Sequence, residues 1–182
     1  MKLYLLRHGQ TDWNVQWKLQ GVSDTSLNEN GINQAREAAS RYADLPFDAV
    51  YSSPLKRAKV TAEILAEPHG LTVIEDKRII EMCFGDLEGT TPEETKGDIN
   101  RYNLFHNPPE YIPTGNGESF EQVRSRCEAF VEDIKQSGYE HVLVVSHGGL
   151  CRGIESVIFG RSLKDFWGTG PQGNCEIIEV EL

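Results

Sequence analysis

Residues 2–14 read KLYLLRHGQTDWN and carry the strongest structural signal in the chain. The apolar run at 3–6 is typical of a short strand buried on both faces of a sheet. It ends directly in Arg7, His8 and Gly9, which supply a cation, an imidazole and a residue that permits close backbone approach. A buried strand with such a tip ends either in a solvated turn or at a site for a phosphate group.

Strand-like and helix-like segments alternate along the rest of the chain. Further apolar runs typical of strands lie at residues 49–52, 71–75, 142–145 and 175–182. Amphipathic helix patterns occupy residues 28–43, 53–66, 119–134 and 150–158. This alternation predicts an α/β fold, a three-layer α/β/α sandwich with a mostly parallel central sheet. We interpret residues 1–182 as a single domain.

Three helix starts carry N-capping signals. Ser53-Pro54 places a serine at the N-cap and a proline at the first helical position. Thr91-Pro92-Glu93-Glu94 and Ser119-x-x-Gln122 read as capping boxes, each predicting a helix. The region from about 76 to 118 contains glycine, proline and scattered aromatic residues. We interpret it as a helical and loop insertion that covers the active site at one end of the sheet.

The acidic composition narrows the classes of partner. The 182 residues include 18 Lys and Arg against 28 Asp and Glu, a formal net charge of −10. A general nucleic-acid or membrane-surface binder needs a basic face, so neither partner is expected. No apolar run approaches the roughly 20 residues that span a bilayer, and the N-terminus lacks the pattern of a secretory signal. Four separated cysteines without a C-x-x-C motif favour a reducing compartment, so a cytoplasmic location is expected.

Charged and small residues follow three of the predicted strands directly. After Arg7-His8-Gly9 come SSPLKR at 52–57, behind the second strand, and Ser146-His147-Gly148-Gly149, behind the late one. Because the carboxyl ends of parallel strands meet at one edge, two histidines and two arginines should converge there. Arginine pairs bidentately with tetrahedral oxyanions, and helix N-termini attract anions. This edge is therefore predicted to bind a small phosphate, with the glycines allowing the backbone to approach it.

A fourth group, EMCFGDLEG at 81–89, would bring a carboxylate to the same rim. Cleavage of a phosphate ester needs a nucleophile, charge stabilisation and an acid for the leaving oxygen. The four groups together supply all three. A metal site built from His8, His147 and Cys151 is disfavoured by the spacing of these residues and by the arginines, which repel a cation. No metal and no cofactor are expected.

Six ordered motifs resemble those of the histidine phosphatase superfamily, in particular its phosphoglycerate mutase-like group. They are LRHGQTDWN (6–14), QG (20–21), SSPLKRAKVTA (52–62), EMCFGDLEG (81–89), GES (117–119) and SHGG (146–149). Their order and spacing cover the chain from end to end. The resemblance implies the fold already predicted and an activity in phosphoryl transfer.

Individual roles follow from the resemblance by position. It implies that His8 is the nucleophile and becomes a phosphohistidine. Arg7, Arg57 and His147 would hold the phosphoryl oxygens, and Glu81 would protonate the leaving oxygen and later activate water. The residues that match positions contacting phosphate or substrate in the family are Asn14, Gln20 and Gly21.

One departure from the mutases favours a phosphatase. Met82 follows Glu81 where mutases carry arginine, and beyond Glu88 the insertion has only Lys96 and Arg101 as cations. The expected function is a metal-independent phosphomonoesterase acting on a small phosphorylated metabolite. The motifs are similar to those of small phosphatases such as the α-ribazole phosphatases, which makes α-ribazole 5'-phosphate a candidate substrate. Phosphoglycerate mutase activity and a non-catalytic phospho-ligand-binding module stay open as alternatives, and a homodimer is compatible with the sequence.

Two further groups are assigned from their surroundings in the sequence. The aromatic residues Tyr102, Phe105 and Tyr111 of the insertion are predicted to select a bulky or ring-bearing leaving group. The remaining histidines lack partners of the kind that surround His8 and are interpreted as surface residues; they are His69, His106 and His141.

Overall fold

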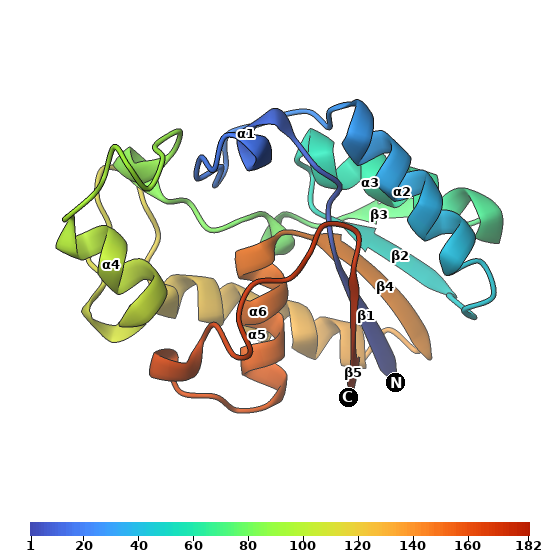
Figure 1. The fold of residues 1–182 in the computed structure, drawn as a ribbon. Coiled ribbons are helices and arrows are strands. Elements are labelled where there is room, and N and C mark those ends of the chain that lie inside the picture. Colours follow the sequence, from blue (N-terminus) through green and yellow to red (C-terminus); the bar gives the residue numbers. More distant parts are fainter.

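The computed structural model describes residues 1–182 and places a five-stranded sheet between two layers of helices (Figure 1). The strands are β1 (Lys2–Arg7), β2 (Ala49–Ser52), β3 (Val73–Glu75), β4 (His141–Ser146) and β5 (Ile177–Glu181). Their order in the sheet is β3-β2-β4-β1-β5, and only β5 runs antiparallel to its neighbour. The predicted α/β sandwich with a mostly parallel sheet is confirmed.

The helices cover both faces of this sheet. They are α1 (Asp12–Val15), α2 (Glu29–Arg41), α3 (Lys56–Ala66), α4 (Ile99–His106), α5 (Phe120–Lys135) and α6 (Gly148–Ile158). Helices α2 and α3 pack on one face and α5 and α6 on the other, while α1 and α4 lie beyond the ends of the strands (Figure 1). Short 3-10 helices lie at Glu67–His69, Lys77–Ile79, Gly85–Leu87, Pro108–Glu110 and Leu163–Asp165.

The continuous apolar run of β1 serves two cores at once. Leu3 and Leu5 point into the cluster formed with α5 and α6, whereas Tyr4 and Leu6 point into the cluster formed with α2 and α3. Successive side chains of a strand face opposite ways, so a strand covered on both sides must be apolar at every position. Each fully buried leucine contributes about 1.5–3 kcal/mol to the stability of the fold.

The predicted capping signals have different outcomes. The Ser119–Gln122 capping box forms and opens α5 as expected. Ser53 is not an N-cap, because α3 begins at Lys56 with Leu55 in the N-cap position. The Ser53 hydroxyl lies instead 2.8 Å from Nε2 of His147, so this side chain is part of the site at the strand ends.

The helix predicted from Thr91 is wrong, although its capping box forms. The amide of Thr91 donates to Glu94, whose own amide donates to the Thr91 hydroxyl. Residues 92–97 nevertheless form turns only, because they carry no apolar stripe to pack and end in Gly97 with φ +83°. The helix of this region is α4, which is capped by Asp98.

The carboxyl ends of β1, β2 and β4 meet at one edge, as predicted. Arg7 pairs with Ser146 across β1 and β4, and Ser52 pairs with Val145 across β2 and β4. The amide of His8 continues the ladder by donating to the Ser146 carbonyl at 3.0 Å. The motifs that follow these strands therefore start from the same level of the sheet, and the 76–118 segment lies beyond this edge (Figure 1).

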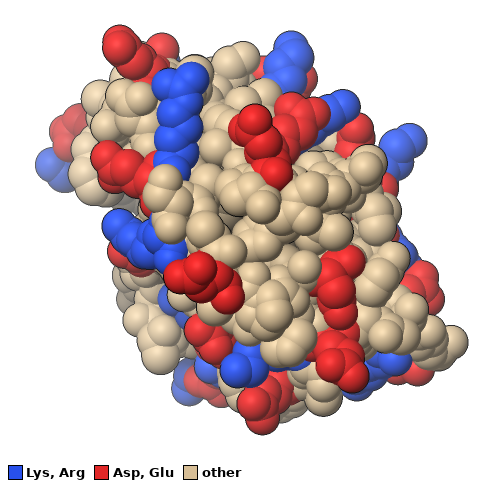
Figure 2. Space-filling model, turned by 90° about the vertical axis from the view of Figure 1, so that its right-hand side faces the viewer, with Lys and Arg blue, Asp and Glu red and all other residues tan.

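Charge is distributed unevenly between the surface and the interior. On the face drawn in Figure 2, acidic and basic side chains are interspersed and no broad basic patch gathers. Arg57, by contrast, is fully buried at the strand ends. None of the helices combines the length and apolar character required to cross a bilayer. The positive charge that bears on the site thus comes from inside the fold.

Candidate active site

His8 lies at the tip of β1 and is almost completely buried. Its Nδ1 is 2.7 Å from the Gly9 carbonyl oxygen, which can only accept a hydrogen bond, so Nδ1 carries the proton. Nε2 is left with a lone pair and accepts a hydrogen bond from Nε of Arg57 at 3.2 Å. Nε2 is therefore the nitrogen of His8 that can act as a nucleophile.

The surroundings of His8 keep its ring neutral. Burial, reinforced by the positive charges of Arg57 and Arg7, lowers the pKa of His8 well below its ordinary value. The pKa of His147 is lowered by burial and by Arg57 in the same way. A neutral imidazole keeps its lone pair, so His8 is available for attack at neutral and mildly acidic pH.

Two side-chain nitrogens beside His8 are buried without a hydrogen-bond partner. Nε of Arg7 has no partner, although its Nη1 donates to the Gln172 carbonyl at 2.7 Å. Nδ1 of His147 has none either, while its Nε2 lies 2.8 Å from the Ser53 hydroxyl. The His8 and His147 ring centroids are 5.2 Å apart. Buried polar groups normally find partners, so these two nitrogens are placed to meet a ligand. Nε of Arg7, and Nδ1 of His147 in the tautomer that protonates it, would donate to the oxygens of a phosphoryl group.

Arg57 links the nucleophile to a neighbouring loop. Nη1 donates to the Ser23 carbonyl at 2.7 Å and to the Thr25 hydroxyl at 3.4 Å, and Nη2 donates to the Gly21 carbonyl at 2.7 Å. With Nε on His8, one of its five N–H bonds has no protein acceptor. Arg57 therefore fixes the loop, orients His8 and keeps one N–H for a ligand.

Glu81 brings a carboxyl group to the same edge. Its Oε1 accepts from the Met82 amide at 3.0 Å and its Oε2 from the Gly149 amide at 3.2 Å. Burial raises the pKa of Glu81, outweighing these two hydrogen bonds and the charge of Arg57. The carboxyl group therefore keeps its proton to a higher pH than an exposed glutamate, which suits a general acid.

Two of the glycines predicted to approach a ligand also make close packing contacts within the protein, and one of them, Gly149, lines the cavity at the site. A Cβ on Gly9 would lie 2.4 Å from the Gly31 carbonyl oxygen, and one on Gly149 would lie 2.7 Å from Oε1 of Glu81. Gly9 thus lets β1 pass α2, and Gly149 lets the Glu81 carboxyl reach the first turn of α6. Gly148 has open space beside Arg7, whose nearest side-chain atom would be 3.8 Å from an added Cβ.

The predicted substrate-contacting residues Asn14, Gln20 and Gly21 lie at the same site. Asn14 caps the amide of Thr11 at the start of α1, and Gln20 accepts from the hydroxyls of Thr11 and Thr25. Gly21 adopts φ +54° and lies against the carboxylate of Glu88, where a Cβ would be 2.0 Å from Oε1. This position therefore requires glycine.

The sequence analysis did not predict a role for Glu88 at the site. Its carboxylate accepts from the amides of Val22, Ser23 and Phe84 and from the Ser23 hydroxyl at 2.6 Å. It thereby joins the loop held by Arg57 to the segment that follows Glu81. Only its place within the 81–89 motif could have drawn attention to it.

These side chains surround a cavity of about 460 Å³. The predicted residues that line it are Arg7, His8, Asn14, Gln20, Gly21, Arg57 and Glu81. His147 stands behind the lining, in contact distance of His8. The lining residues that sequence reasoning did not assign include Lys18, His106, Arg152, Trp167 and Gln172.

The three aromatic residues predicted to select a leaving group lie in three different places. Phe105 lines the cavity together with His106, which is exposed at its mouth. Tyr102 lines a wider outer cavity of about 1010 Å³ that shares Phe105 and His106 with the inner one. Tyr111 is buried in the core against Phe120, so its predicted role in selection is wrong.

A loop before β5 also reaches the site. Asn174 donates to the His8 carbonyl at 2.7 Å, and Gln172 donates to the Leu5 carbonyl at 2.9 Å. The amide of Cys175 donates to the Arg7 carbonyl at 2.8 Å. Because β5 is antiparallel, its amino end meets the carboxyl ends of the other strands, and the loop before it arrives at the same edge. The sequence analysis predicted that three strand ends converge at the site. It did not predict that the loop before β5 is a fourth segment there.

The fold and sequence match proteins of known family. The family model for the histidine phosphatase superfamily (branch 1) matches residues 3–182. Phosphoserine phosphatase 1 of Hydrogenobacter thermophilus is 34% identical over 184 residues, which cover 100% of this chain and 87% of that protein. The alpha-ribazole phosphatase from Shigella flexneri superposes with a TM-score of 0.87 at 29% identity, covering 100% of this chain and 91% of that chain. A mycobacterial glucosyl-3-phosphoglycerate phosphatase gives a TM-score of 0.86 at 31% identity, with coverage of 98% and 88%.

Proposed function

The chain belongs to the histidine phosphatase superfamily (branch 1), and we propose that it is a metal-independent phosphomonoesterase that works through a phosphohistidine at His8. The observation that carries the proposal is the set of groups around Nε2 of His8. A neutral imidazole, whose Nε2 lone pair accepts a hydrogen bond from Arg57, lies beside the unpartnered nitrogens of Arg7 and His147. That combination supplies a nucleophile and the charge stabilisation of a phosphoryl group without a metal ion.

In the first step the lone pair of His8 Nε2 attacks phosphorus, and the bond from phosphorus to the leaving oxygen breaks. The N–H groups of Arg7, Arg57 and His147 hold the other phosphoryl oxygens as their charge redistributes. Glu81 gives its proton to the leaving oxygen, so that an alcohol departs rather than an alkoxide. His8 is then phosphorylated and Glu81 is a carboxylate.

In the second step water attacks the phosphohistidine. Glu81 now takes a proton from the water, the bond from phosphorus to nitrogen breaks, and the electron pair returns to Nε2. Inorganic phosphate is released, and both side chains regain their starting protonation states. The same carboxyl group serves as acid and then as base because it faces the same oxygen position in both steps.

The substrate is proposed to be a small metabolite with one phosphate. The relatives are phosphatases of phosphoserine, alpha-ribazole phosphate and glucosyl-3-phosphoglycerate, so the family does not select one substrate. The outer cavity, with Phe105 and Tyr102 on its wall, supports a leaving group larger than the phosphate itself. α-Ribazole 5'-phosphate is the candidate among these that carries an aromatic ring.

Mutase activity is disfavoured by the charges around the cavity. A mutase retains a bisphosphate, whose phosphates each carry about −1.5 to −2 charge near pH 7. Arg152 is the additional arginine on the wall, but its Nη1 is paired with Glu155. Lys18 is the additional lysine, and it lies on the wall shared with the wider outer cavity. This arrangement supports departure of the alcohol and entry of water.

We expect p-nitrophenyl phosphate to be hydrolysed in the presence of EDTA at the rate seen without it. We also expect phosphate release from the best monoester to exceed interconversion of 2- and 3-phosphoglycerate, measured side by side with 2,3-bisphosphoglycerate supplied. Activity lost in EDTA and restored by a divalent metal contradicts metal independence. Mutase turnover equal to hydrolysis contradicts the assignment as a phosphatase. If no monoester is turned over, the alternative of a non-catalytic phospho-ligand-binding module is supported instead.

The pH dependence follows from two opposite pKa shifts. Burial and nearby arginines lower the pKa of His8, while burial raises the pKa of Glu81. The first step needs His8 neutral, which holds above its pKa, and Glu81 protonated, which holds below its pKa. Ordinary values of about 6.5 for histidine and about 4.3 for glutamate leave little enzyme in that state, and both shifts increase it. We expect kcat/KM for an alkyl phosphate to peak at mildly acidic pH and to fall on both sides.

The alkaline limb of that profile is assigned by substitution. Glu81→Gln removes the titrating carboxyl group, so the fall at higher pH should disappear while the remaining rate is low. The measurement is kcat/KM across the pH range, because this quantity reports the groups of the free enzyme. An alkaline limb that persists in Glu81→Gln assigns it to another group.

A further inference from the structure

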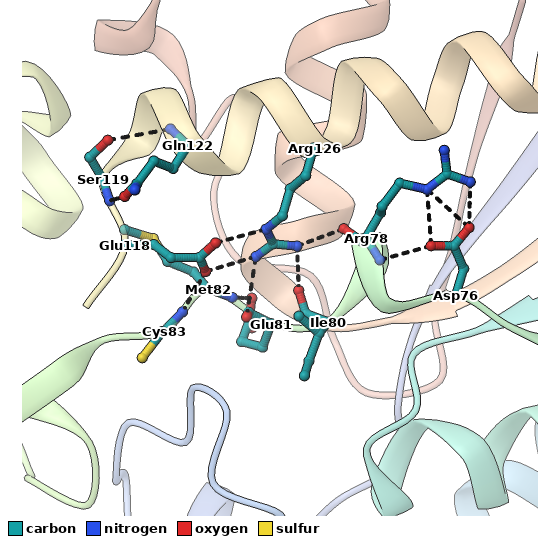
Figure 3. A network of polar contacts seen from close by, with 10 residues as sticks. All are labelled: Asp76, Arg78, Ile80, Glu81, Met82, Cys83, Glu118, Ser119, Gln122 and Arg126. Atoms are coloured by element: carbon teal, nitrogen blue, oxygen red, sulfur yellow. Dashed lines mark hydrogen bonds and ion pairs between the residues drawn. The ribbon is translucent and has the colours of Figure 1, made fainter. Parts of the chain in front are cut away.

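We infer that Arg126, paired with Glu118, is a positioning residue that holds the loop carrying Glu81 against the phosphoryl site (Figure 3). Neither side chain lines the cavity. Arg126 hydrogen-bonds Glu81 only at its backbone carbonyl, and its positive charge acts to lower the pKa of the Glu81 carboxyl against the larger effect of burial. The inference rests on the proposed function, because it assigns Arg126 a role in catalysis through the proton that Glu81 transfers.

The loop before Glu81 depends on side chains for its hydrogen bonds. Arg126 donates to the carbonyls of Arg78 at 2.6 Å, Ile80 at 2.7 Å and Glu81 at 3.2 Å. The carbonyl of Ile79, between them, accepts from the Ser146 hydroxyl at 2.7 Å. Four consecutive carbonyls are thus satisfied from α5 and from the end of β4. Because buried carbonyls need partners, removing Arg126 frees three of the four to move.

Arg126 is itself completely satisfied. Its Nε and Nη2 donate to the two carboxylate oxygens of Glu118, both at 3.0 Å, in a bidentate pair. With the three carbonyls, all five of its N–H bonds have acceptors. The side chains of Arg126 and Glu118 are only 15% and 24% exposed, so this planar arrangement is held within the fold.

Glu118 holds the backbone on the other side of Glu81, at Cys83. Its Oε2 accepts from the amide of Cys83 at 2.9 Å, and its own amide donates to the Cys83 carbonyl at 2.8 Å. The pair therefore fixes the backbone at the carbonyl of Glu81 and again two residues later. Figure 3 shows both sides of this arrangement around Glu81.

The Glu81 carboxyl group has little room to tolerate movement of its backbone. It hydrogen-bonds the amide of Gly149 at 3.2 Å, and a single Cβ on Gly149 would already collide with it. A displacement of about 1 Å in a catalytic group costs on the order of a hundredfold in rate. Loss of Arg126 should therefore reduce proton transfer to the leaving group while leaving His8 and its cations in place.

A purely structural role for Arg126 predicts a different result. Loosening α5 from the loop would then lower the fraction of folded enzyme, which affects every substrate alike. The rate ratio for two substrates measured on one preparation cancels that fraction. p-Nitrophenolate leaves readily without a proton, whereas the alkoxide of glycerol needs one. Because kcat/KM covers only the steps up to departure of the leaving group, and not the later attack of water that also uses Glu81, the ratio of kcat/KM for p-nitrophenyl phosphate to that for glycerol phosphate isolates the acid.

The variants are Arg126→Met, Arg126→Lys and Glu118→Gln, with Glu81→Gln as the reference for a lost acid. Arg124→Met is the matched control. Arg124 is a half-buried arginine of the same helix, but it donates to Ser156 and to the Arg161 carbonyl, away from the Glu81 loop. We expect Arg126→Met to lose about 10- to 100-fold in kcat/KM for glycerol phosphate and less than about threefold in kcat/KM for p-nitrophenyl phosphate. Arg126→Lys and Glu118→Gln should shift the ratio in the same direction by less, and Arg124→Met should not shift it.

Each result bears on the inference separately from the proposed function. If Glu81→Gln changes the ratio and Arg126→Met does not, the positioning role is wrong and the function of Glu81 stands. The same conclusion follows if Arg124→Met shifts the ratio as far as Arg126→Met. If Glu81→Gln leaves the ratio unchanged, Glu81 is not the acid, and both proposals are overturned. Should Arg126→Met be too unstable to purify, Arg126→Lys and Glu118→Gln decide by the same ratio.

Discussion

His8→Ala is expected to lower the turnover of p-nitrophenyl phosphate by about 10⁴-fold or more, the scale seen when an enzyme loses its nucleophile. Alanine removes Nε2 and with it the covalent intermediate, and no serine, cysteine or water in the proposed mechanism replaces it. Quenching the wild-type enzyme during turnover should trap a phosphoryl group that is labile in acid and stable in alkali. The same quench of His8→Ala should trap none.

The matched control for this substitution is His69→Ala. His69 follows α3 and packs on Phe47, on the side of the sheet away from the cavity, so the phosphoenzyme should still form. His8→Ala leaves Nε of Arg57 without its acceptor, which costs about 1–3 kcal/mol of folding free energy. Thermal unfolding of the variant is therefore measured alongside its turnover. A folded His8→Ala enzyme with wild-type turnover would falsify the nucleophile assignment.

The convergence of His8, Arg57 and His147 was predictable because it depends on one rule of parallel sheets. The strands before them are recognisable as apolar runs, and parallel strands present their carboxyl ends at one edge. No knowledge of side-chain packing was needed for that step. The same rule could not predict Asn174 or Gln172, because they precede an antiparallel strand whose direction the apolar pattern does not reveal.

Local capping signals failed where tertiary contacts outweighed them. The Ser53 hydroxyl was predicted to cap α3 and is instead engaged with His147, and the helix starts two residues later, at Lys56 rather than Pro54. The capping box at Thr91 forms its hydrogen bonds, but a cap contributes only about 1 kcal/mol and cannot hold a helix that has no apolar face. A capping motif thus fixes where a helix begins only when packing already favours that helix.

The positioning role of Arg126 and Glu118 could not be predicted from the spacing of residues in the sequence. Arg126 lies beside the apolar stripe of an amphipathic helix, where an arginine draws no attention, and its three carbonyl acceptors belong to a short 3-10 helix and the loop that follows it. Nothing in the spacing of these residues indicates that they meet. The loop needs them because its carbonyls have no partners within a helix or strand, and that requirement becomes visible only with the chain folded.

Arg57→Ala is expected to lower kcat by about 10²- to 10³-fold, the cost of removing one preorganised donor from a site of developing charge. The substitution also removes the donors for the carbonyls of Gly21 and Ser23, so the loop that forms one wall should loosen and KM should rise. Arg57→Lys restores a positive charge but not the planar set of N–H bonds, because an ammonium on a single stem cannot reach His8 and both carbonyls together. The expected order of kcat/KM is wild type, then lysine, then alanine.

The measurements that separate these effects are kcat, KM and the inhibition constant of inorganic phosphate. Loss of the N–H that faces the phosphoryl group should weaken inhibition by phosphate in both variants, more strongly in Arg57→Ala. Lys56→Ala is the control, because Lys56 is the adjacent residue, its side chain is 65% exposed and it pairs with Asp24 at the surface. Its effect should stay within about twofold, since exposed ion pairs contribute little. If Arg57→Lys matches the wild type in kcat and in phosphate inhibition, positive charge alone suffices, and the planar geometry of Arg57 has no part in stabilising the phosphoryl group.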